Sequence, residues 1–331
     1  MPGVLHKITK LRRTLNGLQR DVGCRLGIGQ SYYEQAKGAR ILVYHGICLQ
    51  DPHRFNTLFA SLKMFETQLR LYKKYFHIIS LDDFYHQRFH DDRFNVCLTF
   101  DDGFANNYRY VLPLLEQYQA PATFFITGIR DAGYDILWND VLCAAYIYGP
   151  EKIIFRNEEF SKANNRKYRS SSTGQRLVDR LRFANFEEKV EMMELLGSCK
   201  KTGEADYWQQ MTTGEIKELS ASKWVTIGSH SYYHNDLANM TGVALKEDMI
   251  KSKQFLENIT GKKINALAFP YGSYTSEVVN EAKRVGFTQL LATDFLFPDD
   301  RNNAALRERL TINPFISAMN QLYANIKGNY D

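Results

Sequence analysis

The sequence predicts an α/β fold built on parallel strands, and two observations carry this prediction. Short apolar runs alternate with helical segments through short connections, which is typical of parallel strands linked by helices. Polar motifs containing Asp, His or Pro-Tyr-Gly directly follow three of these runs. These positions are the carboxyl ends of strands, where α/β barrels gather their active sites.

The elements follow in order along the chain. The first part contains predicted strands at 40–45, 77–79, 96–100 and 122–126, and predicted helices at 64–75, 80–84 and 107–119. Ser80 is a natural N-cap, and Asp82 and Asp83 fit the first turn of that helix better than they fit catalysis. The second part contains predicted strands at 224–227, 266–269, 288–292 and 309–312, and predicted helices at 245–258, 276–285 and 318–326.

The alternation stops between residues 128 and 210, where the chain is polar and rich in predicted helices. Because the strands on both sides are needed to complete one sheet, we interpret about 129–210 as an insertion into a single domain. The expected organisation is a basic N-terminal segment over 1–39 followed by one domain over 40–331. Insertions on such folds often shape access to the site.

Composition excludes several classes of protein. The net charge of +5 is modest for 331 residues, and no dense basic stripe interleaved with aromatic side chains indicates a nucleic-acid partner. The five cysteines are scattered and form no CxxC pair. That pattern argues against a disulfide scaffold and a thiolate zinc site, and it fits a reducing compartment.

The N-terminal segment leaves two alternatives open. Residues 4–26 combine apolar and basic side chains, as a helix resting on an acidic lipid surface does. A basic helix docked on its own domain, or a frayed terminus, fits equally well. No secretory leader and no membrane-spanning stretch is visible in the sequence. We therefore expect a cytoplasmic protein, with membrane association through this segment.

The run Thr99-Phe100-Asp101-Asp102-Gly103 closes an apolar strand with two adjacent carboxylates. Neighbouring side chains of a strand point to opposite faces, so one carboxylate can hold a metal while the other faces a bound water. Gly103 permits the sharp turn that keeps both at the strand end. The alternative is an ordinary turn or a helix N-cap.

Two further motifs complete the candidate site. His230 and His234 are four residues apart after a predicted strand, and on a helical turn this spacing points both rings to one side. With Asp102 they make a two-histidine, one-carboxylate set that leaves coordination positions open, as catalytic metal sites do. Pro270 and Tyr271 follow another strand, where a backbone N–H can serve as an oxyanion donor. An ordinary Pro-Tyr-Gly turn is the alternative.

These three motifs, in this order, resemble the NodB-like polysaccharide deacetylases, carbohydrate esterase family 4. The segments 43–46 and 79–84 are similar to the poly-N-acetylglucosamine deacetylase branch. The resemblance covers residues 40–313 and is weakest in the insertion. It implies an irregular (β/α) barrel of the polysaccharide deacetylase type, with the long helix-rich insertion.

The resemblance also implies a divalent metal ion, most often zinc, with other divalent transition metals as alternatives. It implies the metal ligands Asp102, His230 and His234. It gives Asp101 the role of general base toward a water whose pKa the metal lowers. The hydroxide attacks an acetamide carbonyl, and the metal and the Tyr271 backbone N–H, beside Pro270, hold the oxyanion.

Two departures from the family pattern concern the proton transfers. Many members carry an arginine where this chain has Ala268, and Arg309 is our hypothesis for its replacement. Many also carry a late histidine as general acid, but this chain has none after His234. His45, at the end of the first predicted strand, is our candidate acid. A structural, hydrogen-bonded histidine is the alternative for it.

The leading hypothesis is metal-dependent hydrolysis of the acetamide of an N-acetylated amino sugar in a glycan or a lipid-linked glycan precursor, with release of acetate. One alternative keeps the barrel but hydrolyses a non-sugar C–N bond. Another is a catalytically silent glycan-binding protein, motivated by the missing arginine and the missing late histidine. Intact Asp101 argues against the silent protein, because a binding module needs no base.

Overall fold

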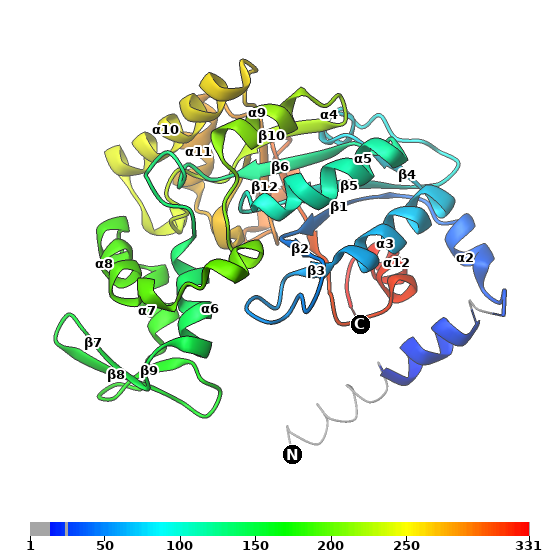
Figure 1. The fold of residues 1–331 in the computed structure, drawn as a ribbon. Coiled ribbons are helices and arrows are strands. Elements are labelled where there is room, and N and C mark those ends of the chain that lie inside the picture. Colours follow the sequence, from blue (N-terminus) through cyan, green and yellow to red (C-terminus); the bar gives the residue numbers. More distant parts are fainter. Residues whose placement is uncertain (1–13, 24–25, 331) are drawn as a thin grey trace.

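The computed structural model describes residues 14–23 and 26–330, and a parallel β-sheet lies at its centre (Figure 1). Strand β4 (Phe76–Ile79) pairs with β5 beside the main path of the sheet. Eight strands follow one another along that path, in the order β13 (Leu306–Glu308), β12 (Gln289–Ala292), β11 (Ala266–Ala268), β10 (Val225–Ser229), β6 (Ala122–Ile126), β5 (Phe94–Phe100), β1 (Ala39–Tyr44) and β14 (Leu310–Thr311). The paired strands are parallel, which confirms the predicted (β/α) barrel.

The chain itself joins the two edges of this sheet. Strand β13 pairs with β12 at one edge and β14 pairs with β1 at the other, and Arg309 alone separates them in sequence. The sheet is therefore a nearly closed barrel. The strand predicted at 309–312 is present as the shorter β14, whereas β13, which precedes Arg309, was not predicted. Three-residue strands are too short to give a periodic signal.

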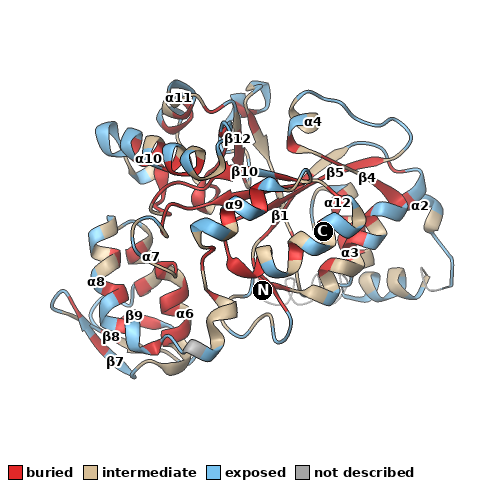
Figure 2. Cartoon of the chain, turned by 45° about the horizontal axis from the view of Figure 1, so that its top comes forward, coloured by how far each residue is buried: buried red, intermediate tan, exposed pale blue. Residues whose placement is uncertain are grey.

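Alternating side chains divide the core into an interior and an outer layer. Ile41, Cys97 and Phe125 share one apolar cluster, while their neighbours Leu42 and Leu98 belong to the larger cluster that includes the helices. This is the two-residue period of a strand whose two faces are both buried. Figure 2 shows the strands buried and the outward faces of the helices exposed.

Helices and short turns surround the barrel. The two-residue strands β2 (Ile47–Cys48) and β3 (Ala60–Ser61) form a separate parallel pair. The outer helices are α2 (Gln30–Glu34), α3 (Leu62–Tyr75), α4 (Leu81–Tyr85), α5 (Leu112–Tyr118), α9 (Thr213–Ala221), α10 (Gly242–Thr260), α11 (Ser276–Val285) and α12 (Ala318–Lys327). The shorter turns are the π-helix η1 (Asn107–Val111) and the 3₁₀ helices η4 (Leu237–Asn239), η5 (Pro270–Gly272) and η6 (Pro298–Asn302).

The predicted N-cap at Ser80 is confirmed. The Ser80 hydroxyl accepts a hydrogen bond from the Asp83 backbone N–H at 3.0 Å. The Asp83 carboxylate in turn accepts one from the Ser80 backbone N–H at 3.4 Å, which completes a capping box. Asp83 therefore stabilises the start of α4, as expected for a structural residue.

The stretch that we interpret as an insertion forms a separate lobe between β6 and β10 (Figure 1). It has its own apolar cluster, which contains Trp138, Phe160 and Trp208. The expectation of a helix-rich stretch missed an antiparallel three-stranded sheet, whose strands are short and half exposed. The elements are α6 (Trp138–Tyr148), β7 (Lys152–Phe155), β8 (Glu158–Lys162), β9 (Tyr168–Ser170), α7 (Leu177–Arg182), α8 (Phe186–Leu196), η2 (Gly197–Cys199) and η3 (Thr202–Tyr207).

The N-terminal segment is described in part, because residues 1–13 and 24–25 lie outside the described residues. Residues 14–23 are helical and contact α12 through polar groups. The Arg20 side chain donates to Asn320 Oδ1 at 2.8 Å and lies over the Tyr323 ring. Leu15 and Leu18 point away and are more than half exposed. The described part is thus docked on its own domain, and contact with a lipid surface stays a prediction.

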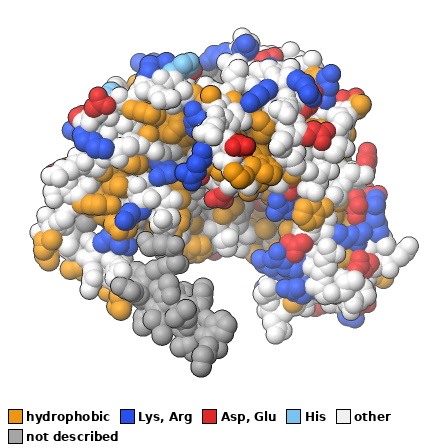
Figure 3. All heavy atoms as spheres, turned by 180° about the vertical axis from the view of Figure 1, so that it is seen from behind, with side chains coloured by type: hydrophobic (Ala, Val, Ile, Leu, Met, Phe, Trp, Pro, Cys, Tyr) orange, Lys and Arg blue, Asp and Glu red, His pale blue; other side chains and the backbone are white. Residues whose placement is uncertain are grey.

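The surface of the described residues is mixed in character. On the face drawn in Figure 3, acidic and basic side chains are interspersed, with apolar ones between them. Cys48, Cys97, Cys143 and Cys199 are free thiols. In the part of the chain that the structure describes, no helix is both long enough and apolar enough to cross a bilayer.

The narrow barrel interior generates a prediction about Gly228. A Cβ atom at this position would lie 2.5 Å from the Phe125 ring, so Gly228→Ala should lower the free energy of unfolding by about 1–3 kcal/mol. Urea denaturation followed by circular dichroism measures this loss. Gly197→Ala is the matched control, because nothing lies within 4 Å of its Cβ position. Equal stability of the two variants would contradict the close packing described here.

Candidate active site

Two strand ends bring the candidate metal ligands together. Asp102 follows β5, whereas His230 and His234 follow β10, and the parallel strands place these ends at one edge of the barrel. His230 Nε2 lies 3.3 Å from Asp102 Oδ1, and His234 Nε2 lies 3.2 Å from the same oxygen. All three side chains are buried. They form a compact set of one oxygen and two nitrogen donors.

The geometry of this set fits a divalent transition metal. Bonds of 2.0–2.1 Å in a tetrahedral site place neighbouring donor atoms about 3.3 Å apart, which matches the two distances to Asp102. The Nδ1–H of His230 donates to the Ala268 carbonyl at 2.8 Å, which leaves Nε2 free to bind an ion. On His234, Nδ1 lies 3.3 Å from the Tyr271 hydroxyl, so its Nε2 is also turned toward Asp102.

The histidine pair is held by a loop, so the prediction of a helical turn is wrong. Ser231 and His234 adopt left-handed backbone conformations, with φ angles of 63° and 52°, and the segment is not helical. The Asp248 carboxylate of α10 accepts hydrogen bonds from the backbone N–H groups of Tyr232 and Tyr233 at 2.8 and 3.2 Å. Burial raises the pKa of Asp248 to about 6. Spacing alone does not reveal this backbone path.

Buried charges shift the pKa values of the ligands. Burial opposes ionisation of Asp102, but hydrogen bonds from His230 and His234 hold its pKa well below the usual range. Burial lowers the pKa of His234. Burial also opposes protonation of His230, but the nearby charge of Asp101 raises its pKa. Asp102 therefore stays anionic over the whole neutral range, as a carboxylate that binds a metal must be.

Asp101 makes a buried, bidentate ion pair with Arg309. Nη1 of Arg309 lies 2.8 Å from Oδ1 of Asp101, and Nη2 lies 2.8 Å from Oδ2. Nη1 also donates to the Thr99 hydroxyl at 3.2 Å. Burial alone would raise the pKa of Asp101, but the charge of Arg309 lowers it. The structure thus brings Arg309 to the carboxylate, as our hypothesis for the missing arginine requires.

The space for Arg309 comes from small residues inside the barrel. Ala268, the position where many family members carry arginine, belongs to the interior cluster. The guanidinium of Arg309 lies over the ring of Phe125, which belongs to the same cluster. Since Ala268 has no side chain beyond Cβ, an arginine from the β13–β14 junction occupies the interior beside Asp101 instead.

Pro270 and Tyr271 lie in the tight turn η5 directly after β11. Tyr271 has a φ angle of 61°, an unfavourable conformation for a side chain of this size. Its ring lies 5.0 Å from the His234 ring, and the guanidinium of Arg182 covers it at 4.8 Å. The turn therefore places the Tyr271 side chain against His234, and the oxyanion role of its backbone N–H stays a prediction.

Two buried titratable side chains also face this region. His45 follows β1, and its buried Nδ1 has no hydrogen-bond partner among the described residues. Asp140 of α6 is buried, and its Oδ2 has no partner there either. Burial and then the charge of Asp102 raise the pKa of Asp140 well above its usual value. Sequence reasoning missed Asp140, because an acidic residue in the first turn of a helix is ordinary.

The insertion also supports the histidine loop. Arg182 of α7 lies 2.7 Å from the buried Asp236 carboxylate, just after His234. Lys189 of α8 donates to Asn235 at 2.6 Å, and burial lowers the pKa of this lysine to about 8. Sequence reasoning assigned no ligand and no site residue to this stretch. The structure shows that it holds the loop from outside the barrel.

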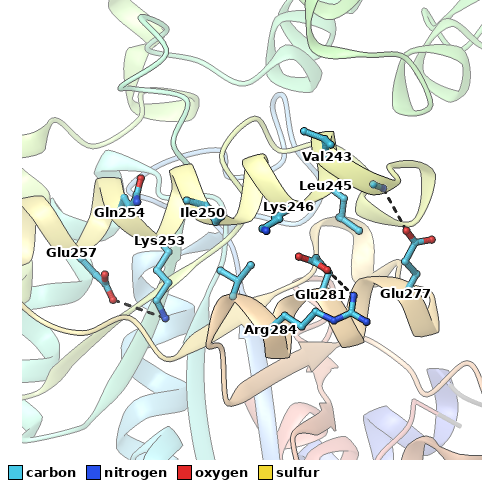
Figure 4. Close-up of a pocket in the computed structure, with 12 residues that line it drawn as sticks. Val243, Leu245, Lys246, Ile250, Lys253, Gln254, Glu257, Glu277, Glu281 and Arg284 are labelled. Atoms are coloured by element: carbon cyan, nitrogen blue, oxygen red, sulfur yellow. Dashed lines mark hydrogen bonds and ion pairs between the residues drawn. The ribbon is translucent and has the colours of Figure 1, made fainter.

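A groove of about 790 Å³ lies elsewhere, between α10 and α11 (Figure 4). Two ion pairs line it: Arg284 lies 2.9 Å from Glu281, and Lys253 lies 3.9 Å from Glu257. None of the candidate site residues lines this groove. The groove is therefore separate from the candidate active site.

The buried ion pair generates a stability prediction. Asp101→Asn and Arg309→Met should each lower the free energy of unfolding by about 3–5 kcal/mol, because each leaves a buried charge without its partner. In the double variant, the decrease in the free energy of unfolding should be smaller than the sum of the two single decreases by at least about 1 kcal/mol. The exposed pair Arg284–Glu281 is the control, and Arg284→Met should cost less than about 1 kcal/mol. Additive losses in urea denaturation would contradict the coupling.

Comparison with known proteins assigns the family. The profile of the family "Polysaccharide deacetylase" matches residues 90–152 and 198–290. These ranges contain Asp101, Asp102, both histidines and Tyr271. His45 and Arg309 lie outside them. The unmatched residues 153–197 contain most of β7 and all of β8, β9, α7 and α8.

Relatives are distant in sequence. A putative polysaccharide deacetylase, YxkH of Bacillus subtilis, is 19% identical over 199 residues, which are 60% of this chain and 44% of that protein. The deacetylase PplD of Streptococcus pyogenes superimposes with a TM-score of 0.54 and 18% identity, covering 88% of this chain and 99% of that chain. The polysaccharide deacetylase BC0361 of Bacillus cereus superimposes with a TM-score of 0.54 and 19% identity, covering 88% of this chain and 69% of that chain. The two structures share the fold with this protein, and the family profile identifies a polysaccharide deacetylase domain in this chain.

Proposed function

We propose that this protein is a metal-dependent deacetylase that hydrolyses the acetamide of an N-acetylated amino sugar. The observation that carries the proposal is the pairing of two adjacent carboxylates with two different partners. Asp102 faces His230 and His234, whereas Asp101 faces Arg309. One carboxylate is thus available as a metal ligand and its neighbour as a base. Metal-dependent amide hydrolysis requires both roles.

Zinc is the proposed ion, because a set of two imidazoles and one carboxylate suits it. An ion held by Asp102, His230 and His234 would supply Lewis acidity and lower the pKa of a coordinated water. Asp101 accepts the proton of the attacking water, and Arg309 keeps this carboxylate ionised and oriented. The Tyr271 backbone N–H, in the turn after Pro270, donates to the oxygen of the acetyl group as negative charge develops on it.

Breaking the C–N bond releases acetate and an amine, and the nitrogen must take a proton. His45 remains our proposed donor, supported by its place at the strand end and by its unpaired Nδ1. Asp140 is the alternative donor, supported by burial, an unpaired oxygen and a raised pKa. A carboxyl group kept protonated near neutral pH can act as a general acid.

The proposed substrate is an N-acetylated glycan or a lipid-linked glycan precursor. The exposed apolar side chains of the N-terminal helix, Leu15, Leu18 and Val22, support contact with a membrane surface where such a precursor is anchored. The insertion beside the metal ligands supports an extended rather than a compact substrate.

Acetate release tests the proposed function. Zinc-loaded protein should release acetate from N-acetylglucosamine oligomers or from a lipid-linked N-acetylhexosamine. Asp101→Asn should lower the rate by about 10²–10⁴-fold while keeping its zinc. His230→Ala should lose activity together with the ion bound at this site, and the exposed Asp82→Asn is the control. Folding of each variant is checked by circular dichroism. Absence of acetate from every N-acetylated substrate would refute the deacetylase, and full activity of Asp101→Asn would remove Asp101 as base.

A change of leaving group identifies the acid. Loss of the proton donor should slow amide hydrolysis by about 10²–10⁴-fold, whereas hydrolysis of 4-nitrophenyl acetate should be spared because its leaving group needs no proton. We expect this pattern for His45→Gln. Finding it for Asp140→Asn instead would transfer the role to Asp140. An equal decrease in the rates of amide and 4-nitrophenyl acetate hydrolysis would show that the residue positions other groups.

A further inference from the structure

A second group of metal donors lies at the opposite end of the barrel. His77 is the second residue of β4, and His90 and Asp92 belong to the loop before β5. One donor atom from each residue lies within 4.8 Å of the other two. The set again has two imidazoles and one carboxylate, but it is open to solvent, whereas the candidate catalytic set is buried.

The three side chains are already arranged around one another. The rings of His77 and His90 are stacked, with centroids 4.0 Å apart and planes inclined by 22°. Nε2 of His77 lies 2.9 Å from Oδ1 of Asp92. The exposure of the side chains leaves room for the small rotations that ligation requires.

A buried side chain holds the loop that carries two of these donors. Asn95 accepts a hydrogen bond from the His90 backbone N–H at 3.0 Å and donates one to the His90 carbonyl at 3.0 Å. It also donates to the Arg93 carbonyl at 3.2 Å. The backbone on both sides of Asp92 is thereby fixed, which reduces the entropy lost when an ion binds.

This cluster is separate from the candidate active site. His77 is paired in register with Asn95, at the amino end of β5. Asp101 lies six residues further along that strand, which corresponds to roughly 20 Å at about 3.3 Å per residue. The two sets therefore share no ligand, and an ion at one cannot contact the other.

We propose that His77, His90 and Asp92 form a second binding site for a divalent transition metal, of the class of Zn²⁺, Ni²⁺ or Cu²⁺. The ion ties the loop between α4 and β5 to β4 at the amino end of the barrel. Water completes its coordination, because these three residues supply three donors. The competing contact of Asp92 is weak, since Arg93 Nε lies 3.7 Å from its other oxygen at the exposed surface. This site does not depend on the proposed deacetylase function.

Zinc content per chain tests the site. The full chain is stripped with chelator, reloaded with Zn²⁺, separated from free metal and measured by elemental analysis. We expect about two ions in the wild type and about one in His90→Ala or Asp92→Asn. His86→Ala is the matched control, because His86 is exposed on the same segment and lies outside the cluster. It should keep the wild-type content.

The two sites are distinguished by combining variants. His230→Ala should retain about one ion, which His90→Ala then removes. A single ion lost in His90→Ala and kept in His230→Ala supports the new site and counts against the catalytic one. Equal zinc contents of wild type, His90→Ala and Asp92→Asn would overturn the proposal, and the histidine pair would then be an ordinary surface stack.

Discussion

The buried ion pair between Asp101 and Arg309 is the interaction on which the site depends. It joins residues 208 positions apart in the chain, and Arg309 is also the residue that links the two edges of the barrel. Burying two charges has a large desolvation free energy. The bidentate geometry of the pair and the hydrogen bond to the Thr99 hydroxyl offset it. The same residue therefore joins the two edges of the barrel and orients the proposed base.

Backbone strain is concentrated around the same strand ends. Asp102, Ser231, His234 and Tyr271 all have positive φ angles, and each such residue costs about 1–3 kcal/mol. The surrounding contacts offset the free-energy cost of these backbone conformations. Asp248 holds the histidine loop through two backbone N–H groups. The insertion holds it through side-chain contacts to Asn235 and Asp236. This arrangement orients the ligands without requiring a regular helix.

Local patterns predicted much of the barrel. The strands near 40–45, 96–100 and 122–126 were found because each is a short apolar run beside a turn. The N-cap at Ser80 was found because a serine directly precedes a helical pattern, and the structure adds the reciprocal hydrogen bond to Asp83. The antiparallel sheet of the insertion and the strand β13 were missed, because their strands are short and half-polar, so burial is set by contacts distant in sequence. The backbone path between His230 and His234 was missed because spacing does not specify dihedral angles.

The sequence by itself determined which chemical groups stand at the strand ends: paired carboxylates, a histidine pair and a Pro-Tyr-Gly turn in fixed order. These are local features, and the two-residue period of a strand already separates Asp101 from Asp102. Only the tertiary structure decided the partners. It brought Arg309 to Asp101, buried Asp140 of the insertion within reach of the charge of Asp102, and stacked His77 on His90. Such contacts depend on how the barrel closes, because closure sets the distances between residues that no local pattern relates.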